Sequence, residues 1–347
     1  MNNSDVSLII LTKGKLGFLL RTLDFYSSTV DFKKCKFIVM DGSDESYFEN
    51  SVRQVSLRNY DLDIRMINTP SKKYYIDRFI KFKKELKSTY VLLAADDDYY
   101  VDGWLANAKK LLATDNGISV VYGQTLRFAL ADYSPYGEML FFEPIGERSP
   151  PLVWLEHATP AERLLTLMRL NSDWPTMGFY ALQRSELLLE IADYAQKNNL
   201  DAFSLEKFMI FVQVLAGKVR MLELPYCVRQ VNNSYVRPLF KYSSERAHFK
   251  VLGAAMHQVL DKYIGGEYSK NLVRKLLWPE RRSLLMNEVS YYLRLLRIRP
   301  SIKLLIKKIS KLTARHEVLD PKLKSVAREN EVNLLKDLIK ISVRSND

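Results

Sequence analysis

The feature that most constrains this fold is an apolar run that stops at three consecutive carboxylates. Residues 91–95 read Val-Leu-Leu-Ala-Ala, and Asp96, Asp97 and Asp98 follow without a spacer. A strand that is covered on both faces shows such a continuous apolar run, which is typical of a parallel sheet. Three adjacent carboxylates repel one another and are costly unless a cation neutralises them. The stretch therefore predicts a buried strand that ends in a cation-binding turn.

Strand-like and helix-like stretches alternate in the first 95 residues. The sequence predicts strands over 6–11, 36–40, 63–67 and 91–95, and helices over 16–26, 47–57 and 75–86. Such alternation with short polar turns indicates βαβ units and a parallel sheet. The turns that follow parallel strands meet at one edge of the sheet, where ligands bind in folds of this class. Carboxylates at that edge favour Mg²⁺ or Mn²⁺ shared with substrate phosphates, so we expect a metal–diphosphate site. The alternative is a solvated acidic turn without any ligand.

Composition places the chain among globular proteins. It has 347 residues, of which 47% are hydrophobic and 12% are aromatic, and it holds no apolar run long enough to cross a bilayer. The polar residues 1–5 lead straight into the first predicted strand, so we expect no secretory signal. Two distant cysteines and four scattered histidines provide no zinc-site spacing. A reducing, cytoplasmic setting is the expectation.

The net charge of +12 belongs to the last third of the chain. Residues 241–347 hold 23 of the 52 Lys and Arg but only 11 of the 40 Asp and Glu, so residues 1–240 are neutral overall. We expect a second, helical region over 241–347 with an anionic partner. Basic amphipathic stretches over 284–312 fit an anionic membrane surface. Packing of their apolar stripe on the rest of the protein fits equally well. A short amphipathic stretch over 333–343 is a candidate oligomer contact.

Three stretches resemble motifs of the family 2-type glycosyltransferases, which have the GT-A fold. They are SLIILTKGKLGFLLRTL for the first strand, turn and helix, FIVMDGSDES for the second strand, and YVLLAADDDYY for the Asp-x-Asp (DXD) metal motif. The resemblance covers residues 5–235 in pieces, in the family's order. It implies an α/β fold, with a Rossmann-like nucleotide-binding sheet and helices on both faces, over residues 1–240. The basic helical extension over 241–347 would contact the acceptor, a membrane surface or another copy of the chain.

The resemblance also implies an activity. It is the metal-dependent transfer of a sugar, such as a hexose, from a nucleotide-sugar donor to a glycan or lipid-linked oligosaccharide hydroxyl. A UDP-sugar is favoured as donor, and Mn²⁺ or Mg²⁺ is the expected cofactor. The pathway implied is bacterial surface-polysaccharide assembly on the cytoplasmic side, with the protein peripheral on the inner face of the membrane.

Carried over to this chain, the resemblance assigns the donor site. Thr12 would contact the nucleotide, and Asp41 would accept a base N–H such as that of uracil. Asp96 and Asp98 would bracket the metal and the ribose, with Asp97 between them in support. For Asp41 the alternative is a plain Asp-Gly turn.

Four further residues are candidates. Arg78 lies on the helix before the acidic strand, where an arginine could reach the diphosphate or simply face solvent. Trp174 could stack on a sugar or lie in the core, and Gly178 belongs to the segment that closes over the sugar in the family. Glu206 falls on the family's base position, where a carboxylate takes the acceptor's proton and the transfer inverts the anomeric carbon. The alternative for Glu206 is a first-turn acid favoured by the helix dipole, and Asp201 is the reserve base.

The remaining pattern predicts a helix over 104–112, a strand over 118–122, a helix over 185–198 and a strand over 219–224. Residues 128–160 lack a clear pattern and are expected to be irregular, as a lid, an acceptor platform or surface filler.

Two rival functions remain. A nucleotidyltransferase would use the same metal site but would usually carry a Gly-rich basic phosphate loop, of which residues 12–15 are a thin version. A basic nucleic-acid-binding module would show recognised reading motifs. None is found, so no nucleic acid is expected as a partner.

Overall fold

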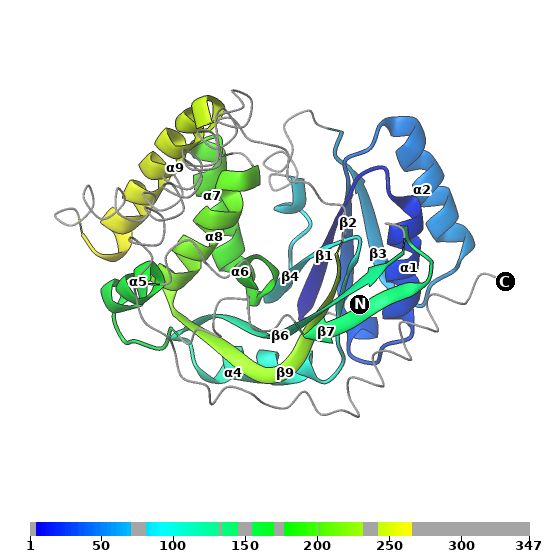
Figure 1. Ribbon diagram of the computed structural model, residues 1–347, viewed down its shortest axis with the longest axis horizontal. Coiled ribbons are helices and arrows are strands. Elements are labelled where there is room, and N and C mark those ends of the chain that lie inside the picture. Colours follow the sequence, from blue (N-terminus) through cyan, green and yellow to red (C-terminus); the bar gives the residue numbers. More distant parts are fainter. Residues whose placement is uncertain are drawn as a thin grey trace, which may run out of the picture.

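The computed structural model describes residues 5–70, 81–131, 134–144, 155–169, 177–200, 202–231 and 242–265 (Figure 1). Four parallel strands form the half of the sheet that the sequence predicts. They are β1 (Val6–Thr12), β2 (Lys36–Asp41), β3 (Asp63–Asn68) and β4 (Tyr90–Ala95), in the order β3-β2-β1-β4. Every residue of β1 is buried, as expected for a strand covered on both faces. In the register of β1 and β2, Thr12 lies beside Asp41.

The other half of the sheet is mixed. β8 (Leu182–Arg184) is antiparallel to both β4 and β6 (Ile118–Leu130), and β9 (Lys218–Gln230) runs parallel to β6. The short β5 (Asp98–Tyr100) pairs with the end of β9, and β7 (Met139–Pro144) pairs with β6. In the described part of the chain, the nine strands thus form one sheet.

Two sequence predictions for this half are wrong. The strand predicted at 118–122 does not end at Gly123 but continues to Leu130, and β7 forms a hairpin with it. Residues 128–130 and 139–144 are therefore strands, although the sequence predicts an irregular segment over 128–160. Likewise β9 passes through Pro225, where the sequence predicts an end. The pairing of β6 with β9 shifts register beside Pro225, and such an irregularity accommodates a residue without an N–H.

Helices cover both faces of the sheet. In Figure 1, α1 (Leu16–Ser27) and α2 (Glu45–Leu57) stand at one end of the molecule. At the other end lie α7 (Ser185–Lys197), α8 (Ala202–Ala216) and α9 (Tyr242–Tyr263). α4 (Trp104–Thr114) packs on β6 and β9. The short α5 (Pro160–Arg169) and α6 (Met177–Tyr180) both contact α8.

The helix that opens the basic region packs on the rest of the protein. α9 contacts α8, and its buried side chains belong to the same hydrophobic core as the sheet; they are Leu252, Ala255, Met256, Val259 and Leu260. Residues 266–347, which include the stretches 284–312 and 333–343, lie outside the described residues. Within the described part, no helix is long and apolar enough to cross a membrane.

Candidate functional site

The carboxyl ends of β1 and β2 bring Thr12 and Asp41 together, as predicted. Both residues are buried, and the Gly42 N–H donates to the Thr12 carbonyl at 2.9 Å. Asp41 Oδ1 accepts from the Ser43 N–H at 2.9 Å and from the Ser43 hydroxyl at 2.5 Å. Ser43 Oγ in turn accepts from the Gly14 N–H at 2.8 Å. These bonds fix the two turns to each other and hold the Asp41 carboxylate in place.

The three aspartates lie at the same sheet edge and are buried. Asp96 and Asp97 form the turn after β4, and Asp98 is the first residue of β5. Their exposed fractions are 3%, 9% and 1%. The alternative of a solvated acidic turn is therefore wrong for this chain.

Asp96 connects the acidic turn with the first strand. Its Oδ2 accepts from the Thr12 hydroxyl at 2.6 Å, and its backbone carbonyl accepts from the Thr22 hydroxyl on α1 at 2.7 Å. Burial, and then the neighbouring charge of Asp97, raise the pKa of the Asp96 carboxyl to about 7, although Lys15 and Thr12 act in the opposite direction. The Asp96 carboxyl thus holds its proton more readily than an exposed aspartate does.

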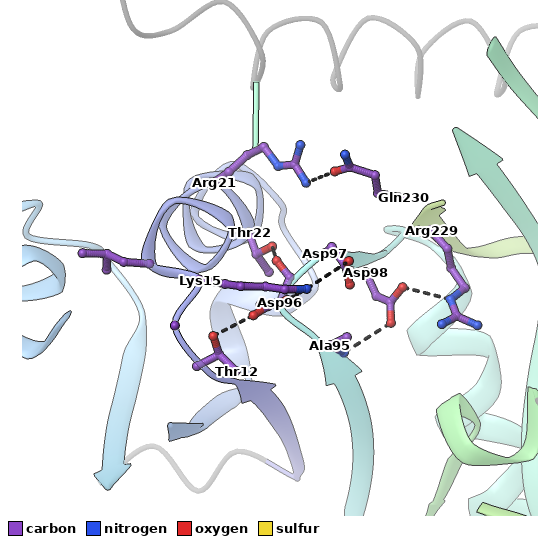
Figure 2. A network of polar contacts seen from close by, with 12 residues as sticks. Thr12, Lys15, Arg21, Thr22, Ala95, Asp96, Asp97, Asp98, Arg229 and Gln230 are labelled. Carbon is purple, nitrogen blue, oxygen red and sulfur yellow. Dashed lines mark hydrogen bonds and ion pairs between the residues drawn. The ribbon is translucent and has the colours of Figure 1, made fainter. Parts of the chain in front are cut away.

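Lys15 provides one of those partners, and sequence reasoning missed it. Its Nζ lies 3.5 Å from Asp96 Oδ1 and 3.8 Å from Asp97 Oδ2, as Figure 2 shows. The residue precedes the first residue of α1, and its side chain is 36% exposed. The thin phosphate-loop pattern over residues 12–15 includes this lysine but does not reveal its contact with the aspartates, because that contact depends on the approach of β4 to β1.

Asp98 turns to the opposite side and pairs with Arg229 of β9 (Figure 2). Arg229 Nε donates to Asp98 Oδ1 at 2.9 Å, and the Ala95 N–H donates to Oδ2 at 3.2 Å. The guanidinium also lies 4.3 Å from the Tyr180 ring centroid and donates to its hydroxyl at 2.9 Å. Burial raises the pKa of the Asp98 carboxyl, and the charge of Arg229 opposes this effect. Sequence analysis missed the pair, which follows from the antiparallel register of Asp98 with Arg229.

Two buried side chains, Arg21 and Gln230, form a hydrogen-bonded pair beside the acidic turn. Arg21 of α1 is 1% exposed, donates to Gln230 Oε1 at 2.6 Å and also donates to the Pro135 carbonyl. The Gln230 N–H donates to the Asp97 carbonyl at 3.2 Å, and its side-chain amide donates to the Ser134 carbonyl at 3.0 Å. The Arg21–Gln230 pair therefore connects α1, the β6–β7 connection and the end of β9 with the acidic turn.

Gly178 lies where α6 packs on α8. A Cβ at this position would meet Gln213 Oε1 at 2.6 Å and Ile210 Cγ1 at 2.8 Å, so a larger residue would push the helices apart. Glu206 precedes Ile210 by one turn and shares its face of α8. Because α8 begins at Ala202, Glu206 lies in the second turn, and the first-turn dipole explanation for it does not apply. The partly buried Glu206 does have an interaction partner. Arg78, Trp174 and Asp201 lie outside the described residues.

The residues at the acidic turn suit a divalent ion that is completed by substrate phosphates. Among the described side chains, no three His, Cys, Asp or Glu converge as a metal cluster. Mg²⁺, however, is usually held by one or two carboxylates together with phosphate oxygens and water. Lys15 already places a cation between Asp96 and Asp97, which shows that this position attracts positive charge.

No protein-family model and no curated protein matches this chain. Among solved structures it is similar to residues 1–349 of TarS from S. aureus, in complexes with UDP and with UDP-GlcNAc. In both cases the TM-score is 0.50 and the identity 11%, over 91% of this chain and 95% of TarS 1–349. TarS is a glycosyltransferase of the GT-A type. The similarity confirms the GT-A-type α/β fold that the sequence predicts.

Proposed function

We propose that this protein is a glycosyltransferase that moves a sugar from a nucleotide-diphosphate donor to a hydroxyl acceptor. The observation that carries this proposal is the 2.6 Å hydrogen bond between Thr12 and Asp96. It joins the turn beside Asp41, which suits a nucleoside, to the acidic turn, which suits a diphosphate and its counter-ion. The two turns that would hold the nucleoside and the diphosphate thus lie side by side at the edge of the sheet where ligands bind in folds of this class.

A UDP-sugar is the donor that we favour. The carboxylate of Asp41 is held by Ser43 in a fixed orientation, and a carboxylate accepts the ring N–H that uracil presents. TarS, whose fold this chain shares, has been solved with UDP and with UDP-GlcNAc. Arg78, as a diphosphate contact, and Trp174, as a sugar or acceptor contact, stay predictions from the sequence.

A divalent ion, Mn²⁺ or Mg²⁺, would be held by Asp96 together with Asp98 or Asp97. When bound it would act as a Lewis acid and stabilise the charge of the leaving diphosphate. The sequence resemblance favours Asp98 as the second ligand, whereas the position of Lys15 favours Asp97. Separate substitution of each by Asn, followed by Mn²⁺ titration, distinguishes the two.

Glu206 is the residue that we propose as the base. It lies one helical turn from the Gly178 contact, and a carboxylate there could take the proton of the acceptor hydroxyl as the hydroxyl attacks. This role predicts inversion at the anomeric carbon. The acceptor is proposed to be a glycan or lipid-linked glycan on the cytoplasmic side of the membrane.

Calorimetric titration of the full chain with nucleotides tests the proposal. UDP should bind in the presence of Mn²⁺, and GDP and CMP should bind about tenfold more weakly or not at all. Asp96→Asn should weaken UDP binding by about tenfold or more, and Asp98→Ala should do the same if Asp98 is the second metal ligand. Asp61→Ala, which removes an exposed carboxylate away from the site, is the matched control and should bind as the wild type. Absence of nucleotide binding under every condition would overturn the proposal.

A further inference from the structure

Lys15 is placed between two carboxylates of different residues. Its ammonium faces Asp96 Oδ1 and Asp97 Oδ2, while the second oxygen of Asp96 is taken by Thr12. Figure 2 shows the extended lysine reaching these two side chains from the start of α1. Arg229 approaches the acidic turn from the other side and contacts Asp98 instead. Lys15 thus pairs with Asp96 and Asp97, and Arg229 pairs with Asp98.

The Lys15 side chain is also the most exposed of the three. The Lys15 side chain is 36% exposed, compared with 4% for Asp96 and 13% for Asp97. A ligand that reaches this sheet edge therefore meets the lysine before the carboxylates. The separations of 3.5 and 3.8 Å are longer than those of a short charge-assisted hydrogen bond, so the ammonium is held loosely enough to be exchanged.

We propose that Lys15 is an exchangeable counter-ion of the acidic turn. In the free protein it neutralises Asp96 and Asp97; a divalent cation displaces it from there, and the displaced ammonium then binds the diphosphate of the donor. The second half of this inference depends on the proposed donor, and the first half does not.

Electrostatics and side-chain chemistry support the exchange. A divalent cation and an ammonium cannot share the same oxygens without strong mutual repulsion at such short range. Lysine carries a compact charge on a flexible stem with three donors, so it can leave one anion and reach another nearby. Its position immediately before α1 keeps it at a helix N-terminus, where a phosphate is favoured.

The exchange predicts effects of opposite sign when the charge is removed. Without the ammonium, no lysine competes with a divalent cation for Asp96 Oδ1 and Asp97 Oδ2, so the metal binds more tightly. Without a phosphate contact, UDP binds more weakly. If Lys15 only stabilised the turn, its removal would weaken the binding of both Mn²⁺ and UDP. If it only bound phosphate, its removal would leave the Mn²⁺ affinity unchanged.

The experiment is calorimetric titration of the full chain, first with Mn²⁺ alone and then with UDP at saturating Mn²⁺. Lys15→Gln should bind Mn²⁺ about tenfold more tightly than the wild type and UDP about tenfold more weakly. Lys15→Arg keeps the charge and should restore most of both affinities. Lys13→Gln removes an exposed lysine from the same turn and should match the wild type. Thermal melting of each variant checks that it is folded.

Equal or weaker Mn²⁺ binding by Lys15→Gln would overturn the inference, as would a lack of Mn²⁺ binding in every variant. Unchanged UDP affinity in Lys15→Gln would overturn the transfer to the diphosphate. Failure of the glycosyltransferase proposal gives a different result. In that case no nucleotide binds to the wild type, although the Mn²⁺ affinities of wild type and Lys15→Gln still differ.

Discussion

At the scale of single residues, the negative charge of Asp96 is destabilising in the folded protein, because the carboxyl is buried beside Asp97. It is almost fully buried beside Asp97, and its pKa of about 7 lies well above its ordinary value of 3.8. The folded protein therefore binds a proton at Asp96 more tightly than the unfolded chain does. The stabilisation from that proton is complete below pH 3.8 and is lost as the pH rises through 7.

Asp96→Asn should remove this loss. In the absence of divalent ions, the variant should be more stable than the wild type at pH 8, with a difference in unfolding free energy on the order of 3 kcal/mol. At pH 4 the two should be similar, because Asp96 is then protonated in the folded wild type. Urea unfolding with EDTA at both pH values measures the difference. Asp61→Asn, at an exposed position, is the control, and a wild-type pH dependence in Asp96→Asn would contradict the assignment.

At the scale of elements, the sequence predicts best where structure is local. The four parallel strands and α1, α2, α4 and α7 lie within a few residues of their predicted bounds, because each has its own apolar period and polar turn. β7 and the long courses of β6 and β9 were missed, since their pairing depends on partners far along the chain. The site divides in the same way. Thr12, Asp41 and Asp96 lie at the ends of strands that the local pattern reveals. The contacts of Lys15 and Arg229, in contrast, arise only from tertiary packing.

Arg163 shows how one such unmarked residue holds an element in place. It is 4% exposed, and its guanidinium donates to the Val214 and Leu215 carbonyls at 2.7 and 2.9 Å. These carbonyls belong to the last turn of α8, which has no helical partners for them. Two further bonds, of 2.8 and 2.9 Å, reach the carbonyls of His157 and Ala158.

Arg163→Met should therefore destabilise the protein by about 3 kcal/mol, because it leaves buried carbonyls without donors. Urea unfolding monitored by circular dichroism measures the loss. Arg53→Met on the exposed face of α2 removes the same charge and should change stability by about 0.5 kcal/mol at most. Equal stability of the two variants would show that the α8 terminus does not depend on Arg163.

At the scale of the whole molecule, charge and site are separated along the chain. Residues 1–240, which carry every proposed site residue, are neutral overall, and the +12 lies in residues 241–347. We therefore expect nucleotide binding at the sheet edge to depend on local cations such as Lys15 and not on a general positive field. The charge of residues 241–347 favours a separate anionic surface as their partner.

We propose that this surface is an anionic membrane and that residues 284–312 bind it. The full chain should sediment with vesicles that contain phosphatidylglycerol and not with neutral phosphatidylcholine vesicles. Combined substitution of Lys303, Lys307, Lys308 and Lys311 by Gln should weaken binding about 1,000-fold, since each lysine near such a surface contributes about 1 kcal/mol. Salt at about 1 M should abolish wild-type binding, because the screening length falls to about 3 Å. The matched control replaces Lys33, Lys34, Lys109 and Lys110, which removes the same charge from the neutral part of the chain. If this control lost as much binding, net charge alone would explain the attraction, and residues 284–312 would have no special role.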